Sequence, residues 1–182
     1  MRVIAGSMRG LRLSAPDGIN TRPTLDRVKE AVFSMLMPYL SNAVVLDLFA
    51  GSGAIGIEAL SRGASKAVFI DNDKSAISCI KKNISSGKVE ERANVFCMDA
   101  IKYLSECNER FDIIFLDPPY FNNAYSSVLE SIAKKDILSP DGIIVVEWDY
   151  EHGFINNGAE FSIFKEKKYG RVGITTLKRG II

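Results

Sequence analysis

A strand, a glycine-rich turn and a helix follow one another between residues 44 and 60. The run Val44–Leu48 is almost entirely apolar, as expected of a buried strand. Gly51, Gly53 and Gly56 follow in the spacing G-x-G-x-x-G, which marks a tight turn leading into a helix. Because glycine has no Cβ, the backbone at such positions can turn sharply and approach a ligand closely. The helix N-terminus adds unpaired N–H groups, so this unit predicts a nucleotide-like ligand.

Two acidic residues near this unit leave two cofactors open. Asp71 lies about twenty residues beyond Gly51, where dinucleotide-binding proteins place the carboxylate that holds a ribose. A nicotinamide dinucleotide would explain the glycines and Asp71, but it gives no role to Asp47 near the end of the first strand. S-adenosylmethionine gives roles to both, because Asp47 can hold its ammonium group while Asp71 receives the ribose hydroxyls. The glycine pattern alone is also compatible with a plain strand-to-helix turn.

Strand-like and helix-like segments alternate from residue 44 onward, which predicts a doubly wound α/β sheet that is mostly parallel. Two further strands are joined through Gly170 and predict an antiparallel hairpin at the end of the sheet. Residues 2–13 predict a small N-terminal hairpin with exposed arginines, and Thr24 is expected to cap a helix from Leu25 to about Leu40. The expected strands are 44–48, 66–71, 93–97, 111–116, 142–148, 161–169 and 172–177.

Four aspartates, Asp47, Asp71, Asp99 and Asp117, lie at the ends of the first four expected strands of this sheet. Ligands of doubly wound sheets bind beyond the carboxyl ends of the strands, so this rim of carboxylates predicts a binding site. Each aspartate taken singly is also a plausible cap for the helix that follows it.

The sequence Asp117-Pro118-Pro119-Tyr120 follows the fourth strand. Two prolines fix the backbone and remove two N–H donors, so the carbonyl groups of this segment point in defined directions. Asp117 adds an acceptor for an amine and Tyr120 adds a flat face on which a base can stack. This set fits the exocyclic amine of a nucleobase held in line with a methyl donor, whereas a rigid turn would explain only the prolines.

The charge of the 182-residue chain is unevenly distributed although its net value is only +1. Residues 1–30 contain six basic and three acidic side chains, and residues 165–182 contain six basic and one acidic side chain. Basic ends favour a nucleic-acid partner if they meet on one face, although a solvated basic surface explains the charge equally well. No apolar run has the length of a membrane span, and three cysteines without metal-ligand spacing predict reduced thiols in the cytoplasm.

These motifs resemble those of class I S-adenosylmethionine-dependent methyltransferases that act on amino groups, a class that includes DNA adenine, RNA guanine and protein glutamine methyltransferases. The N-terminal part narrows the resemblance to the RsmD-type 16S ribosomal RNA guanine-N2 methyltransferases. Its most specific part is the segment Arg22-Pro23-Thr24-Leu25-Asp26-Arg27, and the resemblance covers nearly the whole chain. The chain is compact, with short loops, so substrate-binding additions found in some relatives are expected to be missing.

The resemblance implies a seven-stranded Rossmann-like methyltransferase sheet with an antiparallel C-terminal strand, S-adenosylmethionine as cofactor and no metal. It divides the chain into an N-terminal hairpin and helix, residues 1–40, packed on a methyltransferase core of residues 41–182. The implied cofactor-binding residues are Asp47, Phe49, Ala50, Gly51 and Gly53 at the methionine part, Asp71 and Asn72 at the ribose, and Met98, Asp99 and Ala100 at the adenine. The implied catalytic residues are Asp117, Pro118, Pro119 and Tyr120. The basic residues expected to contact RNA are Arg2, Arg9, Arg12, Arg22 and Arg27.

The sequence thus predicts a cytoplasmic, monomeric enzyme that methylates the N2 amine of a guanine in 16S ribosomal RNA, within the small ribosomal subunit or an assembly intermediate. A DNA adenine-N6 methyltransferase fits the Asp-Pro-Pro-Tyr motif equally well, but no added DNA-recognition region is evident. A non-catalytic RNA-binding or ribosome assembly factor on the same fold is a second alternative. A nicotinamide oxidoreductase would leave the proline motif unexplained.

Overall fold

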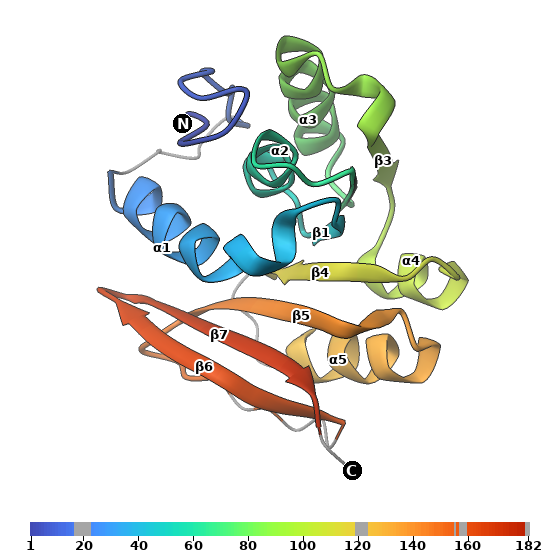
Figure 1. Ribbon diagram of the computed structural model, residues 1–182. Helices are drawn as coiled ribbons and strands as arrows, with labels where there is room; N and C mark the ends of the chain where they lie inside the picture. Colours follow the sequence, from blue (N-terminus) through green and yellow to red (C-terminus); the bar gives the residue numbers. More distant parts are fainter. Residues whose placement is uncertain (17–22, 119–123, 155, 157–159, 181–182) are drawn as a thin grey trace.

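A computed structural model describes residues 1–16, 23–118, 124–154, 156 and 160–180 of the chain. Its centre is a seven-stranded sheet in the order β3-β2-β1-β4-β5-β7-β6 (Figure 1). The first five strands run parallel, and β7 is antiparallel to both of its neighbours. The strands are β1 (Val44–Leu48), β2 (Lys66–Asp71), β3 (Ala93–Cys97), β4 (Phe111–Leu116), β5 (Leu138–Asp149), β6 (Phe161–Tyr169) and β7 (Val172–Arg179).

Helices cover both faces of this sheet, as predicted for a doubly wound fold (Figure 1). They are α1 (Pro23–Leu40), α2 (Ala54–Ser61), α3 (Lys74–Gly87), α4 (Ala100–Glu106) and α5 (Ala124–Lys135), with a 3-10 turn at Glu90–Arg92. One apolar core joins α1, α2 and α3 to one face of the sheet, and a second joins α4 and α5 to the other face. The predicted fold class is therefore confirmed. No helix among the described residues is long and apolar enough to cross a membrane.

Two predicted starts are wrong, and β5 and β7 end one and two residues later than predicted. The helix α1 begins at Pro23, so Thr24 lies inside the helix rather than capping it. Proline suits the first turn, because its fixed φ is helical and its missing N–H would have no partner there. The strand β5 begins at Leu138 instead of Gly142, since Leu138 already pairs with Phe111 before a register shift in the ladder. Such an irregularity accommodates Pro140 and Gly142, which are unfavourable inside a regular strand.

The N-terminal residues form a compact hairpin that packs on the core. An antiparallel bridge joins Arg2 to Arg12, and the N–H of Val3 donates to the carbonyl of Leu11 at 2.9 Å. Val3 and Leu13 are buried in the same core as α1 and α2. The arginines of the hairpin are exposed, as predicted.

Candidate active site

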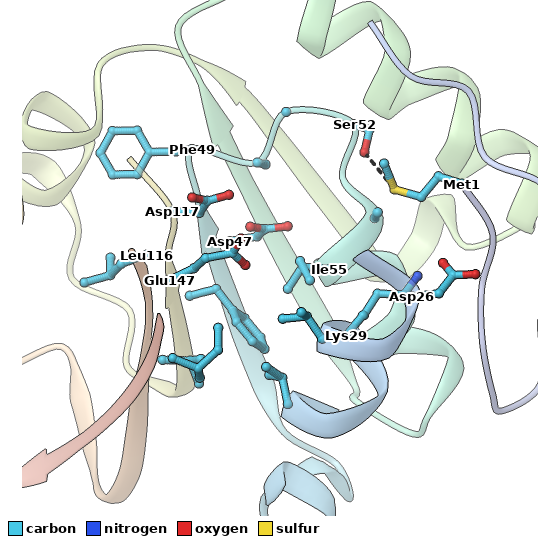
Figure 2. A pocket seen from close by; sticks show the side chains of 18 of the residues that line it. Met1, Asp26, Lys29, Asp47, Phe49, Ser52, Ile55, Leu116, Asp117 and Glu147 are labelled. Atoms are coloured by element: carbon cyan, nitrogen blue, oxygen red, sulfur yellow. Dashed lines mark hydrogen bonds between the residues drawn. The ribbon is translucent and has the colours of Figure 1, made fainter. Parts of the chain in front are cut away.

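A pocket of about 240 Å³ lies at the carboxyl ends of β1, β4 and β5, where α1 forms one of its walls (Figure 2). The turn between β1 and α2 and the residue after β4 meet in this pocket, so the two sequence motifs share one cavity. The lining residues are Met1, Pro16, Asp26, Val28, Lys29, Val32, Asp47, Phe49, Ala50, Gly51, Ser52, Ala54, Ile55, Phe115, Leu116, Asp117, Val145, Glu147 and Ile174.

The turn between β1 and α2 has the geometry that its glycines predict. Gly53 has φ 75° and precedes the first residue of α2, a conformation that costs glycine little. Gly56 lies so close to the sheet that a Cβ at this position would be 2.3 Å from Cε1 of Phe69. Phe49 adopts φ 64°, which is uncommon for a bulky residue. Strained backbone of this kind concentrates at ligand sites, so Phe49 supports a binding role for the turn.

Asp47 is almost completely buried, with 4% of its surface exposed. One of its carboxylate oxygens accepts a hydrogen bond from the N–H of Gly56 at 3.0 Å. The pKa of Asp47 is raised to about 8, mainly by burial and also by the nearby carboxylates of Asp117 and Asp71, although the Gly56 hydrogen bond acts in the opposite direction. A cationic ligand would stabilise the charged form of this carboxylate, because an opposite charge nearby favours ionisation.

Asp71 at the end of β2 holds the glycine turn in place. Its two oxygens accept hydrogen bonds from the N–H of Gly51 at 2.8 Å and from the N–H of Asp73 at 2.9 Å. Each carboxylate oxygen has a second lone pair, so acceptor capacity remains for a ribose hydroxyl. Asp99 differs, since its side chain caps α4 by accepting from the N–H of Lys102 at 3.0 Å.

Asp117 is solvent-accessible on the pocket wall, where its carboxylate lies between Phe49 and Glu147 (Figure 2). The surrounding protein limits its hydration and raises its pKa to about 6. Pro118, the next residue, is buried. Pro119 and Tyr120 lie outside the described residues, so the stacking face expected of Tyr120 stays a prediction. The part of the motif that is described therefore presents one acceptor carboxylate to the pocket.

Glu147 near the end of β5 is a further pocket carboxylate, beside Asp26, Asp47 and Asp117, and it was not predicted from the sequence. Its burial raises its pKa to about 8, and the adjacent Asp117 contributes to this shift. The available signal was the single acid in the apolar run Ile143-Ile144-Val145-Val146-Glu147-Trp148. Strict alternation places Glu147 on the same sheet face as Val145, which also lines the pocket.

The pocket contains an excess of negative charge. Lys29 is the lysine on its wall, but its ammonium group pairs with Glu58 at 3.1 Å and donates to the carbonyl of Arg2 at 2.6 Å. Within the described ranges, no ion pair involves Asp47, Asp117 or Glu147. The described part of the chain also holds no cluster of histidine, cysteine and acidic side chains arranged for a metal ion. The arrangement suits a ligand rich in N–H donors or positive charge.

The sequence model of a family described as "Conserved hypothetical protein 95" matches residues 1–178. The chain belongs to this family. The match confirms the resemblance to the RsmD-type methyltransferases. The ribosomal RNA small subunit methyltransferase D of Escherichia coli (strain K12) is 35% identical over 179 residues, which cover 98% of this chain and 90% of that protein. The protein of the same name from Haemophilus influenzae is 37% identical over an alignment that covers 94% of this chain and 90% of that protein.

Solved structures share the fold. A conserved hypothetical protein from Streptococcus pyogenes is 38% identical and superposes with a TM-score of 0.78 over 84% of this chain and 95% of its own. The SMU.776 protein, solved in complex with S-adenosylhomocysteine (SAH), has a TM-score of 0.69 at 18% identity and covers 89% of this chain and 51% of its own. At 18% identity, the similarity to the SMU.776 protein concerns the fold alone.

Apart from Pro118, Pro119 and Tyr120, the residues implied by the RsmD resemblance fall into three groups. Those that line the pocket are Asp47, Phe49, Ala50, Gly51 and Asp117. Those that lie along the neighbouring edge of the sheet, outside this pocket, are Gly53, Asp71, Asn72, Met98, Asp99 and Ala100. The exposed arginines are Arg2, Arg9, Arg12 and Arg27, of which Arg2 pairs with Asp26 at 3.2 Å, whereas Arg22 lies outside the described residues.

Proposed function

We propose that this protein transfers a methyl group from S-adenosylmethionine to the exocyclic N2 amine of a guanine in 16S ribosomal RNA. One observation carries the proposal: the glycine turn with Asp47 and the first residue of the Asp-Pro-Pro-Tyr motif line the same pocket. A methyl donor and an acceptor base must meet at such a place, because good alignment of two reactants is worth effective molarities of about 10⁵–10⁸ M. The naming of the family members after ribosomal RNA supports the substrate class.

The donor set of the pocket fits S-adenosylmethionine better than a nicotinamide dinucleotide. Asp47 is buried without a cation, and the ammonium group of S-adenosylmethionine would supply one. A pyrophosphate would instead bring negative charge towards Asp47, Asp117 and Glu147, which is unfavourable at short range. Asp71, whose carboxylate oxygens each have a second lone pair available, would accept hydrogen bonds from the ribose hydroxyls. The SAH bound by the SMU.776 protein is in line with this cofactor on the same fold.

Asp117 would act on the amine of the base. When bound, S-adenosylmethionine supplies an electrophilic methyl group, and the N2 lone pair of guanine forms the new C–N bond as the C–S bond breaks. The lone pair is partly delocalised into the ring, so the amine must be turned towards the donor. Asp117 can accept an N–H hydrogen bond that fixes this orientation, and it can accept the proton that N2 releases after transfer. Tyr120 is expected to stack on a flipped base.

The alternative functions differ in their product. A DNA adenine-N6 methyltransferase would use the same motif on another base, and a ribosome assembly factor would bind RNA without transferring a methyl group. To separate them, the protein is incubated with methyl-labelled S-adenosylmethionine and, separately, DNA, free ribosomal RNA or unmodified small subunits. Nucleoside analysis should give labelled N2-methylguanosine from RNA or small subunits. Labelled N6-methyladenosine from DNA, or no label in any arm, would contradict the proposal.

Replacing Asp71 with alanine should weaken SAH binding by about 10- to 150-fold, the equivalent of about 1.5–3 kcal/mol for lost hydrogen bonds to a charged acceptor. The substitution removes the acceptor for the ribose and leaves the N–H of Gly51 without its partner. Calorimetric titration measures the affinity. The control is Asp73→Asn, which removes a neighbouring charge but keeps a side chain able to cap α3. Unchanged SAH affinity in Asp71→Ala would show that the Asp71 carboxylate is not the ribose acceptor.

Replacing Arg9 and Arg12 together with alanine should weaken RNA binding and reduce its dependence on salt, while SAH affinity stays unchanged. Both arginines are exposed on the hairpin, where they can contact phosphate without selecting a base. For each phosphate that is no longer neutralised, the slope of log affinity against log salt should become shallower by about 0.7–0.9. The matched control replaces Lys102 and Lys134 on the opposite side of the sheet with alanine. Point substitutions are preferable to truncation of the hairpin, because Val3 and Leu13 belong to the core.

A further inference from the structure

Glu147 stands beside Asp117 at the same level of two neighbouring strands. Leu116, the last residue of β4, pairs with Val146 of β5, so the residues that follow this pair are Asp117 and Glu147. Neighbouring strands lie about 4.8 Å apart, which brings the two side chains within reach of a single small planar group. Figure 2 shows both carboxylates directed into the same pocket, together with that of Asp47.

The backbone of Glu147 is held from two sides. The hydroxyl of Tyr125 in α5 donates to the carbonyl oxygen of Glu147 at 3.0 Å, and β7 pairs with it through Ile174. A carboxylate on a rigid central strand keeps its position when a ligand binds, which is what a specificity contact requires.

No polar partner satisfies this carboxylate within the part of the chain that is described, where neither a hydrogen bond nor an ion pair involves its oxygens. Buried apolar side chains line the same pocket, among them Val32, Val145 and Ile174. Burial and the neighbouring Asp117 raise its pKa to about 8. A ligand that donates N–H groups would therefore stabilise the charged form of the Glu147 carboxylate.

The position of Glu147 places it on the base side of the pocket. The glycine turn and Asp71 belong to β1 and β2, on one side of β4, whereas Glu147 belongs to β5 on the other side. Since the cofactor would occupy the β1–β2 side, the space between β4 and β5 remains for the acceptor base.

We propose that Glu147 selects guanine by accepting the N1–H of the target base, while Asp117 accepts from the N2 amine. This inference rests on the proposed guanine-N2 function. The N1–H and N2–H groups of guanine are adjacent donors on its Watson–Crick edge, and two carboxylates offer only acceptors there. Adenine presents an acceptor at N1, so it offers no N–H group to stabilise the charged carboxylate of Glu147. The residue thereby separates a guanine-N2 enzyme from an adenine-N6 enzyme that uses the same Asp-Pro-Pro-Tyr motif.

The test is Glu147→Gln, assayed on the RNA or small subunits that the wild-type protein methylates. The kcat/KM for guanine should fall by about 5- to 150-fold, the range for removing one good hydrogen-bonded pair with a base. SAH affinity should stay unchanged, which also shows that the variant is folded. The matched control is Glu151→Gln, an exposed acid on the turn after β5, which should retain the wild-type rate.

A second substrate separates base selection from a general loss of activity. RNA carrying 2-aminopurine at the methylated position keeps the amine but has an acceptor at N1. Wild-type protein should prefer guanine over 2-aminopurine, and the preference should shrink in Glu147→Gln, because the glutamine amide can donate to N1. If the wild-type protein forms N2-methylguanosine but Glu147→Gln has an unchanged kcat/KM and an unchanged preference, Glu147 does not read the base. If the wild-type protein methylates adenine instead, both proposals are wrong.

Discussion

Replacing Asp117 with alanine is expected to lower the rate of methyl transfer by about 100-fold or more, with little change in SAH or RNA affinity. The substitution removes the acceptor that would orient the target amine, but it leaves the glycine turn and the exposed arginines unchanged. Orientation of a weak nucleophile matters more in the transition state than in the ground state, so the loss should fall on the chemical step. Its expected size is that of removing one preorganised electrostatic interaction. Single-turnover assays with saturating cofactor measure this rate.

The variant Asp117→Asn provides the matched control. It keeps a carbonyl oxygen that can accept from the amine, so it should retain more activity than alanine. The pKa of Asp117 is raised to about 6, and the charged form is the better acceptor, so the wild-type rate should rise with pH through about 6. The asparagine variant should lose this rise. Methyl transfer by Asp117→Ala at the wild-type rate would show that the amine is oriented by another group.

Local sequence signals specified most of the sheet. The strands β2, β3 and β4 have the predicted boundaries, because each is a short apolar run that ends at an aspartate or a polar turn. The start of β5 was missed, since Pro140 and Gly142 favour a turn and only pairing with β4 extends the strand across them. That pairing is non-local, so no window of sequence contains it.

In the candidate site, too, the residues marked by a local pattern could be predicted and those defined by non-local pairing could not. The glycines and Asp47 were found because their spacing along one strand-turn-helix unit is itself the signal. Glu147 was missed because its role depends on Asp117, which directly follows the neighbouring strand β4 and is about thirty residues away in the chain. A lone glutamate in a strand looks like a solvent-facing residue until the sheet order brings β4 and β5 together. Predicting such pairs requires the strand order and register, which local patterns do not contain.

The second large effect is expected at Glu58, a fully buried acid of α2 that joins the N-terminal hairpin to the core. Its carboxylate accepts from the N–H groups of Ile4 at 2.8 Å and Ala5 at 3.0 Å. It also pairs with Lys29 at 3.1 Å and Arg62 at 2.7 Å. Glu58→Ala would leave two buried cations and two N–H groups without this acceptor. The free energy of unfolding should therefore fall by about 3–5 kcal/mol, as for a broken buried ion pair.

Denaturant unfolding of Glu58→Ala and Glu109→Ala tests this expectation. Glu109 pairs with Lys66 at 2.7 Å, but both side chains are more than 30% exposed, so its loss should cost about 1 kcal/mol or less. The hairpin packs tightly enough on α2 that a Cβ at Gly6 would lie 1.9 Å from the carbonyl oxygen of Ser61. Removal of the Glu58 carboxylate should therefore also displace the arginines and weaken RNA binding more than SAH binding. Equal destabilisation by the two alanine variants would mean that apolar packing alone holds the hairpin.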